Sequence, residues 1–73
     1  MSEVIMIPVS SSNVAELGYD ADNQIVYVSY LNGTKYIYKG VAQYEYDNLL
    51  NSPSIGSYLH RNFKNVYPYE RIE

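Results

Sequence analysis

The second half of the chain carries residue types that bind anions. Ser52-Pro53 is typical of a helix start, because Ser is a favoured N-cap and Pro is tolerated at the first helical position. Free N–H groups and the helix dipole favour the binding of a phosphate at the start of a helix, and Gly56 would let the phosphate approach the backbone closely. The candidate ligand-binding residues on this helix are Ser54, Gly56, Ser57, Tyr58, Arg61 and Lys64.

The same pattern also fits a capped surface helix whose polar face is only solvated, and the sequence leaves this alternative open. Ser10, Ser11 and Ser12 show no nucleophile pattern and are expected to bond the backbone in a turn. Ser11 is also included among the candidate ligand-binding residues.

Tyrosine dominates the aromatic residues: ten of the 73 residues are Tyr, against one Phe and no Trp. A Tyr ring fills apolar space, yet its hydroxyl needs water or a polar partner. Stacking of a nucleic-acid base on such a ring contributes about 1–3 kcal/mol to the binding free energy and needs little positive charge. We expect Tyr36 and Tyr38 in the core, with hydroxyls that would line any pocket at its edge. The tyrosines expected to be exposed are Tyr27, Tyr58, Tyr67 and Tyr69.

Catalytic and metal chemistry find little support. The chain has no Cys, so thiol nucleophiles and disulfides are excluded. The lone His60 has no acidic or nucleophilic neighbour at a helical step and is expected at the surface. Glu45 and Asp47 are two positions apart and do not face a common point on a helix. The sequence therefore predicts a protein that is not an enzyme and needs no metal or cofactor.

The formal net charge is −3 and the isoelectric point is near 4.9, whereas proteins that track long nucleic acids usually carry a basic stripe. The charges are also segregated. Those before Thr34 are all acidic, and every basic residue lies at or after Lys35. One basic patch on an acidic body would suit a few phosphates better than many.

The first forty residues predict antiparallel strands joined by polar turns. The expected strands are Val4 to Val9, Val14 to Tyr19, Gln24 to Leu31 and Thr34 to Lys39. Asp20 to Asn23 is a predicted turn, and Gly18 is the candidate position of a bulge.

The hairpin around Asn32-Gly33 allows two registers, and a slip of one residue exchanges the faces. A two-residue turn would pair Leu31 with Thr34, whereas a three-residue loop with a left-handed Gly33 would pair Tyr30 with Thr34. The second register separates apolar from polar residues better, and we favour it. Its buried face is Val26, Val28, Tyr30, Tyr36 and Tyr38. Its other face is Tyr27, Ser29, Lys35 and Lys39, with Ile25 and Ile37.

After Gly40 the apolar period becomes helical. A short helix is predicted over about Ala42 to Asn51, and a second begins at Ser52-Pro53. The second helix has an apolar stripe of Ile55, Leu59, Phe63 and Val66 and an opposite face of Ser57, His60, Arg61 and Lys64. Tyr67-Pro68-Tyr69 ends it, and the tail through Ile72 is expected to be extended.

These elements predict one α+β domain over residues 1–73, a small antiparallel meander of three to four strands followed by two short helices packed on one face. The other face would remain open. The candidate interface residues are Tyr27, Ile37, Tyr67 and Tyr69. Short chains often gain stability by oligomerising, so a homo-oligomer is expected.

One set of residues occurs in a characteristic order along the chain: Val9-Ser-Ser-Ser-Asn-Val14, Gly18-Tyr-Asp20, Tyr30-Leu-Asn-Gly33, Tyr36-Ile-Tyr38, Gly40-Val41, Tyr46, Leu49-Leu50, Ser54-Ile-Gly56, Tyr58 and Tyr67-Pro-Tyr69. This ordered set resembles the KTSC domain family. The family's hallmark is a central Tyr-x-Tyr, here Tyr36 and Tyr38, and the resemblance covers about Ile7 to Ile72. The family is named for the C-terminus of some lysyl-tRNA synthetases and also occurs alone in small bacterial and phage proteins. The resemblance implies the fold, and it suggests RNA binding through the synthetase connection alone.

Two positions depart from the family pattern. Ala42 stands where Pro is usual, so the first helix start is less sharply defined. Lys64 stands where Arg is usual, which keeps the charge but loses a planar two-pronged contact to phosphate.

The sequence thus predicts a binding module for a nucleotide or short RNA, with bases stacked on Tyr and phosphate held at a helix N-terminus. A sharper variant is a phage-type protein that sequesters a cyclic nucleotide or oligonucleotide signal within an oligomer. The alternative is a protein-interaction or self-assembly module with an exposed Tyr-rich sheet face. No targeting segment or membrane-spanning apolar run is present, so we expect a protein of the bacterial host cytoplasm without a membrane partner.

Overall fold

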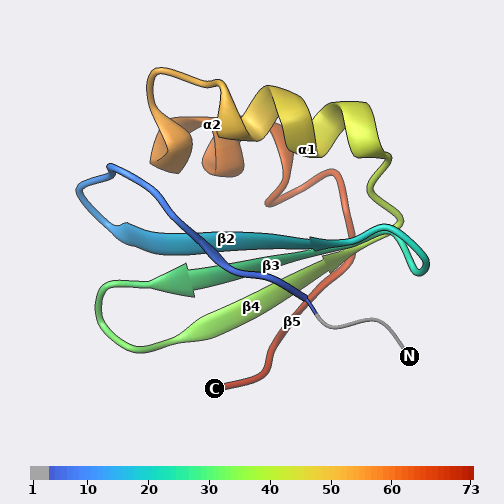
Figure 1. Ribbon diagram of the computed structural model, residues 1–73, viewed down its shortest axis with the longest axis horizontal. Coiled ribbons are helices and arrows are strands. Elements are labelled where there is room, and N and C mark those ends of the chain that lie inside the picture. Colours follow the sequence, from blue (N-terminus) through green and yellow to red (C-terminus); the bar gives the residue numbers. More distant parts are fainter. Residues whose placement is uncertain (1–3) are drawn as a thin grey trace.

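The computed structural model describes residues 4–73 as a five-stranded antiparallel sheet with two helices on one side (Figure 1). The strands are β1 (Ile7–Pro8), β2 (Val14–Asp20), β3 (Ile25–Tyr30), β4 (Lys35–Lys39) and β5 (Tyr69–Arg71), and their order in the sheet follows the chain. The helices α1 (Gln43–Leu50) and α2 (Ile55–Asn62) lie between β4 and β5 in the sequence. The predicted α+β class is confirmed, although the sheet has five strands rather than three or four.

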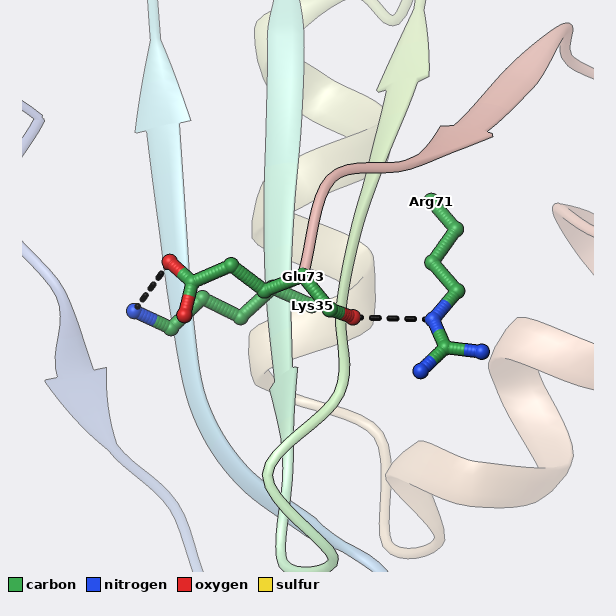
Figure 2. Close-up of polar contacts among 3 residues, drawn as sticks. All are labelled: Lys35, Arg71 and Glu73. Carbon is green, nitrogen blue, oxygen red and sulfur yellow. Dashed lines mark hydrogen bonds and ion pairs between the residues drawn. The ribbon is translucent and has the colours of Figure 1, made fainter.

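The additional strand is β5, which the sequence predicted only as an extended tail. It runs antiparallel beside β4, and the Ile72 N–H donates to the Lys35 carbonyl oxygen at 2.8 Å. Figure 2 shows the end of this tail, where Lys35 Nζ lies 3.4 Å from the Glu73 carboxylate and Arg71 Nε donates to the Glu73 backbone oxygen at 2.9 Å. The Ile72 hydrogen bond and the Lys35–Glu73 ion pair hold the tail on the edge of the sheet.

The β3–β4 hairpin adopts the register with the three-residue loop. The Tyr30 N–H donates to the Thr34 carbonyl oxygen at 2.8 Å, and Gly33 is left-handed with φ +92°. Tyr38 consequently lies opposite Val26 on the face below the helices, where both side chains are buried. The predicted inward direction of the two central tyrosines is confirmed, with Tyr38 buried and Tyr36 half-buried.

The opposite face of the sheet is partly covered by the N-terminal segment, which runs across the sheet in Figure 1. A Cβ on Gly18 would lie 2.5 Å from Met6 Sδ and 2.8 Å from Val4 Cγ1, so this segment packs directly on β2. Ile37 is only 9 % exposed and Tyr27 is half-buried. The expectation that Ile37 stands on an open face is therefore wrong.

Two expectations for the first strands are also corrected. Only Ile7–Pro8 of the predicted Val4 to Val9 strand pairs with β2. The register irregularity in β2 lies between Val14 and Glu16 rather than at Gly18. Gly18 instead allows the N-terminal segment to pack closely on β2. A glycine within a strand pattern indicates either a bulge or such a close approach, and the sequence does not distinguish the two.

The helix α2 begins later than predicted, with Ser54 rather than Ser52 at the N-cap position. The Ser52 hydroxyl accepts the Ser54 N–H at 3.2 Å and donates to the Ser54 carbonyl oxygen at 3.1 Å, which stabilises the turn before the helix. The helix ends at Asn62, and Val66 is 62 % exposed. Val66 therefore does not continue the apolar stripe as predicted.

One core fills the space between the sheet and the helices. Its members are Val14, Leu17, Val26, Val28, Tyr38, Val41, Tyr46, Leu49, Ile55, Leu59 and Phe63. The Tyr19 ring stacks on Tyr46 at 5.0 Å between centroids, and the Tyr19 hydroxyl donates to the Val41 carbonyl oxygen at 2.5 Å. Within residues 4–73, neither helix is long and apolar enough to cross a membrane.

Candidate functional site

A cleft lies between the start of α2, the loop before β2 and the tip of the β3–β4 hairpin. It consists of two adjoining hollows of about 740 Å³ and 350 Å³, both lined by Asn13, Gly56 and His60. We call the larger one the serine half; its other lining residues are Ser10, Ser11, Ser12, Pro53, Ser54, Ile55, Ser57 and Arg61. We call the smaller one the tyrosine half; its other lining residues are Tyr30, Asn32, Thr34, Tyr36, Tyr38, Leu59, Lys64 and Tyr69.

The cleft brings together every candidate ligand-binding residue except Tyr58. The serine half contains Ser11, Ser54, Gly56, Ser57 and Arg61, and the tyrosine half contains Tyr36, Tyr38 and Lys64, with Gly56 shared. These residues come from a loop, a strand and a helix that are far apart in the sequence, so only the packing of α2 against the sheet makes them neighbours.

Tyr58 lies on another side of α2. Its hydroxyl donates to Glu45 Oε1 of α1, and its ring centroid lies 6.1 Å from that of Phe63. This hydrogen bond raises the pKa of Tyr58, because only the protonated phenol can donate to the carboxylate. Tyr58 is half-buried rather than exposed. It links the two helices and does not line the cleft.

The start of α2 presents unpaired donors to the serine half. Ser54 makes no side-chain capping hydrogen bond, and no residue in the range 4–73 accepts the backbone N–H groups of Ile55, Gly56 and Ser57. Such N–H groups and the positive end of the helix dipole attract an anion. Arg61 stands over the same half, with its Nε donating to the Ser57 carbonyl oxygen at 3.4 Å.

The two cations on α2 and in the turn that follows it form no internal ion pair in the described part of the chain. Arg61 and Lys64 are exposed, and the salt bridge found within residues 4–73 joins Lys35 to Glu73 instead. His60 is exposed, as predicted, but it lines both halves of the cleft, which the sequence did not indicate. The charges along this edge are therefore available to an external anion.

Ser11 positions the loop before β2. Its hydroxyl donates to Asn13 Oδ1 at 3.1 Å and accepts the N–H groups of Asn13 at 3.3 Å and Val14 at 3.2 Å. The Asn13 carbonyl oxygen accepts the Leu31 N–H at 2.9 Å, which ties the loop to the hairpin tip. The predicted backbone bonding of this serine is thus confirmed, and its hydroxyl is already engaged.

Asn13 is a cleft residue that sequence reasoning missed. Its amide lies on the first turn of α2, where a Cβ on Gly56 would be 2.7 Å from Asn13 Oδ1 and 3.3 Å from Nδ2. An Asn beside a Ser-rich turn has no distinctive sequence signal, because turns contain Asn for backbone reasons alone. Its place in the cleft depends on the docking of α2.

Four rings, Tyr30, Tyr36, Tyr38 and Tyr69, form what we call the tyrosine cluster. Centroid distances are 5.7 Å for Tyr30–Tyr36, 6.0 Å for Tyr36–Tyr69 and 5.7 Å for Tyr38–Tyr69. Tyr69 lies opposite Tyr38 on β5 and is 50 % exposed. The sequence placed Tyr69 among the interface residues, whereas the structure places it on the rim of the tyrosine half.

Tyr67 was also expected to be exposed, but it is half-buried, and its ring centroid lies 5.1 Å from that of Phe63. Burial, with a smaller contribution from Glu45, raises the pKa of Tyr67. Tyr44 is instead 69 % exposed, although it was not among the tyrosines expected at the surface. Exposed tyrosines therefore do not gather on one face as the sequence suggested.

Comparison with known proteins gives consistent matches over most of the chain. The model of the KTSC domain family matches residues 10–67. An uncharacterized protein of Stutzerimonas stutzeri is 34 % identical over 68 residues, which cover 92 % of this chain and 96 % of that protein. The crystal structure of a KTSC domain protein from Yersinia pestis matches with a TM-score of 0.90 at 28 % identity, over 97 % of this chain and 100 % of the other.

Proposed function

The chain belongs to the KTSC domain family, and we propose that it is a small non-enzymatic binding module for a nucleotide or short RNA. The observation that carries this proposal is the junction of two chemically different hollows in one cleft. One half offers donors and cations to a phosphate, and the other offers aromatic rings to a base. A nucleotide contains both groups within one molecule.

The phosphate would lie in the serine half. This half is lined by Ile55, Gly56 and Ser57, whose backbone N–H groups find no acceptor within residues 4–73 and are the donors that an anion needs. Ser54 and Ser57 add hydroxyls, and Arg61 adds a guanidinium that can form two parallel hydrogen bonds to phosphate oxygens.

The base would lie in the tyrosine half. Tyr69 on the rim is half exposed and Tyr36 beside it is half-buried, so part of each ring faces the hollow. Base stacking on an aromatic ring contributes about 1–3 kcal/mol and depends little on net charge. Lys64 lines the same half and can meet a second phosphate or the ribose.

The distribution of charge favours a short ligand. Among residues 4–73, the basic side chains that line the cleft are Arg61, Lys64 and His60. Lys35 is paired with Glu73, and Lys39 lies outside the cleft. Because affinity for a long duplex grows with the number of neutralised phosphates, a chain of net charge −3 is poorly suited to one.

Titration calorimetry with nucleoside monophosphates, cyclic dinucleotides and short single-stranded RNA tests the proposal. Arg61→Glu combined with Lys64→Glu should abolish binding, since it reverses both cations beside the cleft. Lys39→Glu is the matched control, because Lys39 is exposed and lines neither half. Absence of heat with every ligand would count against the function, as would equal losses in the cleft variant and the control.

The sharper form of the proposal is a phage-type oligomer that sequesters a cyclic nucleotide or oligonucleotide signal. Native mass spectrometry of the purified protein tests it directly. Sequestration is supported if the mass of the particle equals that of several chains plus one nucleotide ligand. A bare monomer that gains no subunits when nucleotide is added contradicts it.

The alternative is interaction with another protein or a second copy through Tyr27, Ile37, Tyr67 and Tyr69. Of these, Ile37 is buried, and Tyr27 and Tyr67 are half-buried. Of the four, Tyr69 alone is exposed, and it lines the cleft. Burial of these side chains within the chain is the reason that we rank ligand binding first.

A further inference from the structure

We infer that Asn32, in the loop of the β3–β4 hairpin, selects the base that binds in the cleft. Its side-chain NH2 group donates a hydrogen bond to a carbonyl oxygen of the base, so that uracil is favoured over cytosine. This inference rests on the proposed function and names the kind of base that the tyrosine half accepts. Asn32 lines that half of the cleft.

The orientation of the Asn32 amide is fixed by hydrogen bonds within the hairpin loop. The Thr34 backbone N–H donates to Asn32 Oδ1 at 3.0 Å, and the Thr34 hydroxyl donates to the same atom at 2.7 Å. A backbone N–H can only donate, so the atom that faces it is the amide oxygen and not the nitrogen. Both lone pairs of this oxygen are thus engaged, whereas Asn32 Nδ2 finds no acceptor within residues 4–73.

A second asparagine, at the junction of the two halves, is oriented in the same way. The Ser11 hydroxyl accepts the N–H groups of Asn13 at 3.3 Å and Val14 at 3.2 Å, which occupies its two lone pairs. Its own proton is therefore donated, and Asn13 Oδ1 accepts it at 3.1 Å. The NH2 group of Asn13 is left without an acceptor in the described part of the chain, and it adds a second amide donor to the wall of the tyrosine half.

The charged lining of the tyrosine half has the same donor character. Lys64 contributes an ammonium group, and among residues 4–73 no Asp or Glu lines either half of the cleft. The other polar side chains of this half are hydroxyls and the imidazole of His60, which can donate or accept and do not distinguish between bases. The two amides and Lys64 therefore set the preference of this half, and they favour acceptor atoms on the ligand.

The place of Asn32 indicates which edge of the base it meets. Asn13, Gly56 and His60 line both halves, so the sugar that joins phosphate to base lies at this junction. Asn32 lines the tyrosine half alone and therefore meets the edge of the base that is far from the sugar. In a pyrimidine this edge carries the substituent at position 4, which is a carbonyl oxygen in uracil and an amine in cytosine.

The state of the Asn32 oxygen excludes the usual contacts to an exocyclic amine. An asparagine with both ends free binds adenine through its oxygen and its NH2 group together, and carboxylates accept the amine of cytosine. Asn32 cannot make the first contact because its oxygen is engaged, and among residues 4–73 no carboxylate lines the cleft to make the second. A carbonyl oxygen at position 4 is the group that the free NH2 can bind.

Calorimetric titration at neutral pH with uridine monophosphate and cytidine monophosphate tests the inference. The two ligands share the same ribose and phosphate, so the ratio of their affinities reports the base alone. The wild-type protein should bind uridine monophosphate about three- to tenfold more tightly. Asn32→Asp keeps an oxygen for the Thr34 donors and replaces the NH2 group with a second oxygen, so the ratio should fall to one or below.

Asn65→Asp is the matched control, because Asn65 is exposed and lines neither half. It makes the same change of charge one residue from Lys64 and should leave the ratio unchanged. A general weakening by the added negative charge acts on both ligands and cancels in the ratio. Equal affinities of the wild-type protein for the two nucleotides, a preference for cytidine monophosphate, or an unchanged ratio in Asn32→Asp would overturn the inference.

The two proposals fail in different ways. If the wild-type protein binds no nucleotide or short RNA, the proposed function fails and this inference fails with it. If only short RNA binds, the same ratio is measured with oligouridylate and oligocytidylate. If uracil and cytosine ligands bind equally, only the inference fails. Should Asn32→Asp not fold, the side-chain NH2 resonances of Asn32 in the wild-type protein decide: they should shift with uridine monophosphate and not with ribose 5-phosphate, and the absence of that difference contradicts the inference.

Discussion

Asn13 and Gly56 are in direct contact: a Cβ on Gly56 would lie 2.7 Å from Asn13 Oδ1. The loop before β2 can approach the first turn of α2 this closely only because Gly56 has no side chain. Since both residues line both halves of the cleft, their contact forms the place where the hollows meet. The shape of the candidate site thus depends on the absence of a side chain at Gly56.

Gly56→Ala should alter the cleft more than it alters stability. Ala in a helix is favoured over Gly by about 1 kcal/mol, which offsets the cost of moving a flexible amide, so the free energy of unfolding should change by less than about 1 kcal/mol. The Asn13 side-chain amide should move, which NMR chemical shifts would detect. Asn13→Gly combined with Gly56→Ala removes the crowding and serves as the control. An unshifted Asn13 amide in Gly56→Ala would contradict the described contact.

Removal of the hydroxyl from each of two stacked tyrosines should have different effects on stability. Tyr19→Phe leaves the Val41 carbonyl oxygen without its donor and should lower the free energy of unfolding by about 1 kcal/mol. The Tyr46 hydroxyl is buried without a hydrogen-bond partner, so Tyr46→Phe should be neutral or stabilising. Urea unfolding of both variants measures the difference, and a larger loss in Tyr46→Phe than in Tyr19→Phe would show that this hydrogen-bond assignment is wrong.

Gly33→Ala should destabilise the hairpin through the backbone alone. Gly33 has φ +92°, and a Cβ there would meet nothing within 4 Å, so no steric contact complicates the result. The expected loss in the free energy of unfolding is about 1 kcal/mol. Gly33→Asn should lose less, since Asn tolerates the left-handed region better than Ala. Thermal unfolding of the three proteins checks the order, and an unchanged midpoint for Gly33→Ala would refute the three-residue loop.

Alkaline pH should destabilise the protein. Burial raises the pKa of Tyr19, Tyr30, Tyr38 and Tyr46 above the usual value, and a hydrogen bond to Glu45 does the same for Tyr58. The folded state therefore holds these protons more tightly than the unfolded state, so the stability they contribute is complete below about pH 10 and is lost as pH rises through the raised values. Urea unfolding at several pH values measures this loss, and a constant free energy of unfolding between about pH 8 and 11 would contradict it.

Much of the local structure could be predicted because it depends on short-range rules. Strand residues alternate between two faces, and the register that pairs Tyr30 with Thr34 separates apolar from polar residues better than its alternative, so the inward direction of Tyr36 and Tyr38 could be predicted from the order of residues. The helical spacing of Ile55, Leu59 and Phe63 likewise directs Arg61 to the exposed side of α2.

Only the tertiary structure decided which of these segments meet. The Ser11–Asn13 loop, the start of α2 and Tyr69 on β5 become neighbours through contacts between residues distant in the chain, and such contacts leave no periodic signal. The same reason explains the two main errors: β5 pairs with a strand that ends thirty positions earlier, Lys35–Lys39, and the N-terminal segment packs over Gly18. Periodicity assigns a side chain to a face, whereas packing between distant segments determines what that face covers and where a cleft remains.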